Sequence, residues 1–267
     1  MPHAFPRWFP RQPALRRSAR RALRRIIAWA LRRRSAPYPI ENDRTVLVVA
    51  PHQDDGSLGC GGMILLKRLE GGAVRVVYLT DGAASHPGHP FLRPAELARL
   101  RRSEAQVATA ILGVDQAQLV FLALPDGTLD KLNGSDRRAA VERIAAALLV
   151  FPPEEVFLPY RRDGSSEHEG GFLLVREALA AAELSPRLFE YPVWAWWSPL
   201  RLLRPLLFAR RVWRVDHSGY ETAKAAAVAA YASQTQPTPP WTEPVLSAEF
   251  VAAFTPAIEY FFEIDPL

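Results

Sequence analysis

The sequence is poor in cysteine and lacks long hydrophobic runs. Cys60 is the only cysteine among 267 residues, so no intrachain disulfide can form. This fits a reducing compartment but does not exclude an oxidising one. No apolar run approaches the roughly 20 residues that a membrane-spanning helix needs. The 49% hydrophobic and 23% charged composition is that of an ordinary folded domain.

Acidic residues are missing from residues 1–40, which contain eleven arginines. The rest of the chain carries 22 basic and 28 acidic side chains, so the overall charge of +5 hides a body with a net charge of −6. Such a body disfavours a nucleic-acid partner, because polyanion binding needs a basic surface. We expect a basic amphipathic N-terminal extension at residues 1–40 and one α/β domain at residues 41–267.

A basic amphipathic helix is predicted over residues 14–34. Apolar residues recur there at three- and four-residue steps, and arginines fill most other positions. Such a helix either lies on an anionic membrane surface or packs on its own domain or a partner, and the pattern favours neither. A signal peptide is disfavoured, because the uncharged run at residues 26–31 is shorter than the usual 7–15 or so apolar residues. We expect a cytoplasmic protein, peripheral to the inner face of the membrane if this helix binds lipid.

Strand and helix patterns alternate through the rest of the chain. Residues 45–50 (TVLVVA) are typical of a strand buried on both faces of a parallel sheet. Further strands are predicted at residues 74–80, 118–124, 155–158 and 187–191, and helices at residues 61–70, 95–112, 136–150 and 171–182. This alternation predicts an α/β, Rossmann-like fold, a mostly parallel sheet with helices on both faces. Reactive side chains are then expected at the carboxyl ends of the strands.

The loop after the first strand can bind a metal and move a proton. It reads PHQDDGSLGCGG over residues 51–62 and contains His52, Asp54 and Asp55. An imidazole and a carboxylate suit zinc, whose catalytic sites use three protein ligands and leave a position for water. In a turn, one carboxylate can bind the metal while the other reaches its water. Taken alone, the same residues also fit a helix-capping aspartate and an ordinary loop histidine.

A second loop supplies a third ligand. It reads PYRRDGSSEHEGG over residues 159–171, after a predicted strand, and carries His168 at the entrance to a helix. The carboxyl ends of parallel strands meet at one edge of a sheet, so His168 can complete a His₂Asp set with His52 and Asp55. A lone loop histidine is weak evidence for a metal, and the prediction rests on the two loops together.

Five segments in this order resemble the LmbE-like GlcNAc de-N-acetylases, which include the GlcNAc-phosphatidylinositol (PIG-L) enzymes. The matching segments are PHQDDGSLGCGG, LTDG at residues 79–82, Arg-x-x-Glu at residues 101–104, DGSSEH at residues 163–168 and K-x₆-Y-x-S-Q at residues 224–234. The resemblance extends over residues 45–234. It implies one zinc ion held by His52, Asp55 and His168, with Asp54 as the general base.

The shared motifs also contain candidates for supporting roles. Arg101 and Asp81 are candidates for binding the substrate, and Asp81 and Glu167 are candidates for orienting the metal ligands.

Two positions depart from the family pattern. Gly56 stands where the family usually has Glu, and Ser165 stands where it usually has the histidine that helps to stabilise the oxyanion. Losing an oxyanion donor costs about 10²–10³ in turnover, so a replacement is expected. Ser165 can donate through its own hydroxyl. His86, or His89 in the same loop, can also approach the site, although a mobile surface loop that carries both histidines is the favoured interpretation.

The predicted activity is zinc-dependent removal of an N-acetyl (acyl) group from an amino sugar, as in the family. Residues 193–215 combine four tryptophans with arginines, which suits a lipid- or diphosphate-linked glycan, but also a hydrophobic hairpin or an oligomer contact. The alternatives are a catalytically weak or silent sugar-binding member of the same fold, and an amidase of a secondary metabolite.

Overall fold

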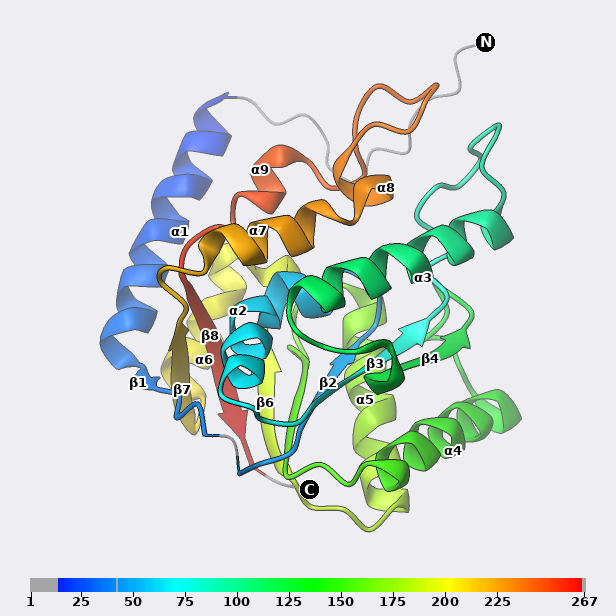
Figure 1. The fold of residues 1–267 in the computed structure, drawn as a ribbon. Coiled ribbons are helices and arrows are strands. Elements are labelled where there is room, and N and C mark those ends of the chain that lie inside the picture. The colour runs from blue at the N-terminus through cyan, green and yellow to red at the C-terminus, as the bar shows by residue number, and fades with distance from the viewer. Residues whose placement is uncertain (1–13, 42, 266–267) are drawn as a thin grey trace.

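The computed structural model describes residues 14–41 and 43–265, which form an eight-stranded sheet with helices on both faces (Figure 1). The strands are β1 (Ala36–Pro37), β2 (Val46–Ala50), β3 (Val74–Thr80), β4 (Leu119–Leu124), β5 (Glu155–Pro159), β6 (Arg187–Tyr191), β7 (Arg211–Asp216) and β8 (Ile258–Ile264). Their order is β1-β7-β8-β6-β5-β2-β3-β4, and only β8 runs antiparallel to its neighbours. The predicted mostly parallel α/β fold is confirmed.

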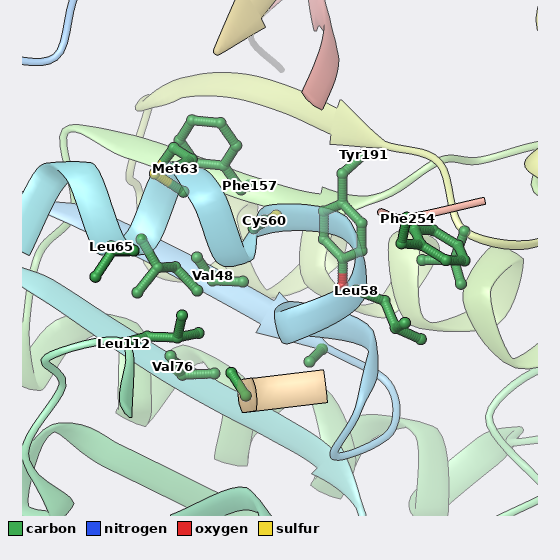
Figure 2. Close-up of a cluster of buried hydrophobic side chains, with 14 of the residues drawn as sticks. Val48, Leu58, Cys60, Met63, Leu65, Val76, Leu112, Phe157, Tyr191 and Phe254 are labelled. Atoms are coloured by element: carbon green, nitrogen blue, oxygen red, sulfur yellow. The ribbon is translucent and has the colours of Figure 1, made fainter. Parts of the chain in front are cut away.

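The helices form two sets, one on each face of the sheet. The longer ones after β2 are α2 (Asp55–Leu69), α3 (Pro94–Ile111), α4 (Gly134–Val150), α5 (Ser166–Ala181) and α7 (Glu221–Ala229). Apolar residues of α2, α3 and α7 share one buried cluster, part of which is drawn in Figure 2, and those of α4 and α5 share another. The short helices are η1 (Gln116–Gln118), η2 (Trp194–Trp196), η3 (Pro199–Leu202), α6 (Leu203–Phe208), α8 (Ala232–Thr235) and α9 (Ala248–Val251).

The continuous apolar sequence of β2 follows from this two-sided cover. Successive side chains of a strand point to opposite faces. Val46 and Val48 accordingly enter the cluster with α2, whereas Leu47 and Val49 enter the cluster with α4 and α5. All four are fully buried, so apolar residues are favoured on both faces of the strand. The strand therefore lacks the alternation of apolar and polar residues that is typical of a half-exposed strand.

The basic helix predicted over residues 14–34 is α1 (Ala14–Arg34), and it packs on the domain. Ile27 and Leu31 are buried in a third cluster with Val212 of β7 and Phe262 of β8. The chain then adds β1 to the edge of the sheet beside β7. Of the two alternatives for this helix, packing on its own domain is therefore present in the structure. In the described part of the chain, no helix is both long and apolar enough to span a membrane.

Helix α2 begins six residues before the helix predicted at residues 61–70, so its glycines lie inside it. They allow close packing. A Cβ atom at Gly59 would lie 2.4 Å from the ring of Tyr191, and one at Gly62 would lie 2.1 Å from the ring of His217. Figure 2 shows Tyr191 against this helix. β8, the antiparallel strand that completes the sheet between β6 and β7, was not predicted from the sequence.

We expect Gly59→Ala to destabilise the protein by about 1–3 kcal/mol, because the new methyl group overlaps the buried ring of Tyr191. Gly56→Ala in the same helix is the control. Its Cβ would meet no atom closer than 3.6 Å, and alanine favours a helix over glycine by up to about 1 kcal/mol. Urea unfolding of both variants measures the difference, and equal stability of the two would contradict this account of α2.

Candidate active site

His52 and Asp55 meet in the turn between β2 and α2. The backbone N–H of His52 donates a hydrogen bond to Oδ2 of Asp55 at 2.8 Å, and Nδ1 of His52 lies 3.1 Å from the same oxygen. Asp55 is the first residue of α2, where the helix dipole stabilises a carboxylate. Local geometry thus fixes both side chains at the carboxyl end of β2.

His168 reaches them from the neighbouring strand. β5 pairs directly with β2, and His168 lies in the first turn of α5, which follows β5. Ser165 caps this helix, and its Oγ accepts a hydrogen bond from the backbone N–H of His168 at 3.5 Å. Nε2 of the fully buried His168 lies 3.2 Å from Oδ2 of Asp55.

The three predicted ligands fit a zinc ion. One donor atom from each of His52, Asp55 and His168 lies within 4.8 Å of the other two. Tetrahedral zinc, about 2.0–2.1 Å from each ligand, holds its ligand atoms about 3.3 Å apart, close to the two distances above. Nε2 of the buried His168 faces Oδ2 of Asp55. A cation between these two atoms would bind both and offset the charge of the carboxylate.

Asp126 and Glu167 form a second acidic group with His52. Both oxygens of Glu167 accept backbone hydrogen bonds, from Gly127 at 3.1 Å and Leu129 at 2.9 Å. Glu167 thereby fixes the turn that carries Asp126, whose Oδ1 lies 3.1 Å from Nε2 of His52. Because both oxygens of Glu167 bind backbone N–H groups, we assign Asp126 and Glu167 to orienting His52 rather than to binding an ion.

Asp163 contacts His168 in the way that Asp126 contacts His52. Its Oδ2 lies 2.7 Å from Nδ1 of His168. The same carboxylate accepts the backbone N–H groups of three consecutive residues, Val193, Trp194 and Ala195. Asp163 therefore ties η2 to the site while it contacts His168. Each imidazole is thus contacted by a carboxylate on the side away from Asp55.

Negative charge dominates around the two imidazoles. Burial lowers the pKa of His52, but hydrogen bonds to Asp126 and Asp55 outweigh it and raise this pKa well above the ordinary value. Burial also lowers the pKa of His168, yet Asp55 and Asp163 raise it to about 9. Buried carboxylates require a compensating charge, which either protonated imidazoles or a bound cation can supply.

Asp54 points to a different partner. Nη2 of Arg101, on α3, donates to Oδ1 of Asp54 at 2.7 Å, and Nη1 donates to the carbonyl of Gly82 at 3.1 Å. Burial raises the pKa of Asp54, and the positive charge of Arg101 partly opposes that rise. A carboxylate with a raised pKa is suited to accepting and returning a proton.

These groups open into a cavity of about 560 Å³. Predicted site residues on its wall are His52, Asp54, Asp55, Arg101, Ser165 and Glu167. Trp194, Trp197 and Arg201, which belong to the aromatic and basic patch predicted at residues 193–215, also line the wall. Asp126, Gln234 and Phe250 line it without a role predicted from the sequence. Asp126 lies just beyond the carboxyl end of β4, so its place after a predicted strand was the available signal.

His86 and Asp81 are not among the cavity-lining residues. His86 is buried and stacks on Trp241 with ring centroids 5.1 Å apart, and its Nε2 lies 3.2 Å from Oγ1 of Thr238. Burial lowers the pKa of His86 to about 4. Oδ1 of Asp81 accepts the backbone N–H of Ala83 at 3.0 Å. Both side chains therefore support the loop after β3.

Solved structures with this fold include enzymes of more than one reaction. N,N'-diacetylchitobiose deacetylase from Pyrococcus horikoshii is 21% identical, with 85% of this chain and 82% of that chain covered and a TM-score of 0.58. The conserved protein TT1542 from Thermus thermophilus is 26% identical, with 84% and 96% covered and a TM-score of 0.60. GalB, the 4-carboxy-2-hydroxymuconate hydratase from Pseudomonas putida, is 20% identical, with 79% and 83% covered and a TM-score of 0.59. The fold alone therefore leaves the reaction open.

The family model described as PIG-L, GlcNAc-PI de-N-acetylase, matches residues 47–179. This segment runs from β2 into α5 and contains both histidines and both adjacent aspartates discussed above. It confirms the resemblance predicted from the five motifs: the chain belongs to the PIG-L, or LmbE-like, family of de-N-acetylases.

Proposed function

We propose that the protein is a zinc-dependent hydrolase that removes an N-acetyl group from an amino sugar. The observation that carries the proposal is the approach of His52, Asp55 and His168 to one point beside Asp54. A sugar-binding module needs no carboxylate with a raised pKa next to such a cluster. The family model supports a de-N-acetylase in particular.

The residues divide the reaction between them. Zinc, when held by His52, Asp55 and His168, supplies a polarised amide carbonyl and a water whose pKa falls to about 7. Asp54 takes a proton from the attacking water and returns it to the leaving nitrogen, which yields acetate and a free amine. Arg101 holds Oδ1 of Asp54, so that the other oxygen can exchange the proton.

Arg201 is the residue we propose for stabilising the oxyanion. It lines the cavity and lies against Gly164, beside Ser165, where a Cβ atom would come within 2.7 Å of its Nε. Arg101 on the same wall binds Asp54. Nη1 of Arg201 donates to the carbonyl of Arg162 at 3.3 Å, but a guanidinium has five N–H donors, so others remain for an oxyanion. The guanidinium of Arg201 can therefore replace the donor that Ser165 lacks.

The substrate we propose is an N-acetylated amino sugar or glycoconjugate. Trp194 and Trp197 give the cavity flat apolar walls of the kind that stack on sugar rings. The other arginines of residues 193–215 suit a phosphate or diphosphate link. A cytoplasmic position, peripheral to the inner face of the membrane through residues 14–34, remains part of this proposal. GalB makes a hydratase the competing reaction, and acetate and amine release from a panel of N-acetylated sugars distinguishes the two.

Asp54→Asn should lower kcat by about 10²–10⁴, because the amide cannot accept the proton, while the zinc content stays unchanged. The control is Asp136→Asn, which changes an exposed aspartate at the start of α4. Steady-state amine release and metal analysis of the same samples provide both readouts. Full activity in Asp54→Asn would remove it from the reaction.

His168→Ala should lose most of the bound zinc and with it the activity, since two ligands hold zinc poorly. Metal removal from the unaltered protein should likewise abolish activity, and added zinc should restore it. His89→Ala, a histidine outside the cavity, serves as control. Circular dichroism checks that each variant is folded. A folded His168→Ala protein with one zinc per chain would contradict the assigned ligand set.

Arg201→Gln should lower kcat by about 10²–10³ with KM changed only a few-fold, because an oxyanion donor acts in the transition state. Arg204→Gln alters an exposed arginine one turn further on and should leave kcat unchanged on a soluble substrate. A raised KM with unchanged kcat would instead make Arg201 a substrate-binding residue.

A further inference from the structure

We propose that α1 and the η3–α6 segment together form one membrane-docking surface, which binds anionic lipid beside the cavity. The surface is defined by the exposed apolar residues Ile26, Trp29, Leu200, Leu203, Leu207 and Phe208 and by the arginines around them. It extends the expectation for residues 14–34 to a second segment far away in the sequence. The proposal does not depend on the reaction that the cavity catalyses.

Exposed apolar side chains are concentrated on these two segments. Among the described residues, fifteen large hydrophobic side chains are exposed, and six of them belong to this surface. Phe208 is 74% exposed, Leu207 64% and Ile26 62%. An exposed apolar group of this size next to positive charge marks a contact site rather than ordinary surface scatter.

The charge around these side chains has one sign. Neither residues 14–35 nor residues 192–215 contain an Asp or Glu, whereas the body as a whole is acidic. Two exposed arginines of the surface pair with acidic residues of other segments, Arg210 with Asp265 at 3.3 Å and Arg21 with Glu249 at 3.4 Å. Further exposed arginines provide the basic rim that an anionic bilayer attracts. They are Arg17, Arg25, Arg32, Arg33, Arg204 and Arg211.

The two segments lie side by side. Leu206 of α6 packs against the cluster that contains Ile27 and Leu31 of α1. Arg34 of α1 donates hydrogen bonds to the carbonyls of Pro205 and Ala209, each at 2.9 Å. Figure 1 shows α1 along the outer edge of the molecule.

Helical spacing then places the exposed residues of α1 on the side of α6. Ile26, Ala30 and Arg34 are four residues apart and share one side of α1, the side from which Arg34 reaches α6. On α6, Leu203 and Leu207 are also four residues apart and are exposed. The apolar residues of the two helices can therefore enter one interface together.

This surface adjoins the wall of the cavity. Trp197, Ser198 and Arg201 line the cavity and lie within three residues of the exposed Leu200 in the sequence. From α1, the guanidinium of Arg20 lies 3.5 Å from the ring centroid of Trp197, and Nε of Arg24 donates to the carbonyl of Trp196 at 3.1 Å. Docking through this surface would bring the cavity wall to the bilayer.

A lipid surface fits better than a second copy of the chain. In a symmetric dimer the same patch faces itself, so the arginines of the two copies would repel each other. Tryptophan, leucine and phenylalanine among arginines are the residues that settle at the headgroup level of anionic membranes. The charge complementarity therefore favours the bilayer.

Flotation of the full chain with vesicles tests the proposal. Vesicles of pure phosphatidylcholine are compared with vesicles containing about one third phosphatidylglycerol, at low and high salt. Three paired variants are used: Ile26→Glu with Trp29→Glu on α1, Leu207→Glu with Phe208→Glu on α6, and Phe91→Glu with Val150→Glu as exposed apolar controls on other elements. All six positions are at least 59% exposed, so the variants should fold, and thermal melting checks this.

The unaltered protein and the control pair should bind the anionic vesicles and dissociate as salt rises. The α1 pair and the α6 pair should each weaken binding by about tenfold or more, because each loses apolar insertion and gains negative charge. Loss in the α1 pair alone would overturn a joint surface. If the unaltered protein does not bind the vesicles, the proposal of a membrane partner is wrong. It is also wrong if size-exclusion chromatography shows a dimer of the unaltered protein that both the α1 pair and the α6 pair convert to a monomer.

Discussion

The candidate site depends on the pairing of β2 with β5. Since these strands are parallel neighbours, the turn with His52 and Asp55 and the helix start with His168 meet at one edge of the sheet. Oδ2 of Asp55 is then close to one nitrogen of each histidine. Asp126 and Asp163 contact the other nitrogen of each ring, so the buried cluster carries excess negative charge that a divalent cation would balance.

The same motifs that suggest chemistry also hold the fold together. Glu104 of α3 accepts hydrogen bonds at 2.6 Å from both N and Oγ of Ser233, while Arg101, one helical turn earlier, binds Asp54. Lys224 of α7 forms a buried ion pair at 2.7 Å with Glu259 of β8, whose carboxylate also accepts the backbone N–H groups of Gly62 and Met63 in α2. The late segment of the chain is thereby fastened to the helices that frame the cavity, although it lies outside the segment that matches the family model.

The sequence pattern predicted those strands whose formation depends on local burial. The five strands from β2 to β6 were foreseen because two-sided burial selects continuous apolar runs. The early start of α2 was not, because its glycines serve packing against Tyr191 and His217, which are far away in the sequence. Asp126 was missed for the same reason, since only the folded sheet brings the end of β4 to His52. Arg201 was predicted only as part of the patch at residues 193–215, and its place on the cavity wall depends on the fold. His86 was considered for its residue type, whereas its stacking on Trp241 could not be read from the sequence.

Binding of one zinc ion by the two loops can be tested by anomalous diffraction at the zinc absorption edge, from crystals of the purified protein. We expect a single strong peak about 2.0–2.2 Å from Nδ1 of His52, a carboxylate oxygen of Asp55 and Nε2 of His168. A peak elsewhere in the molecule, or none after zinc is added, would contradict it.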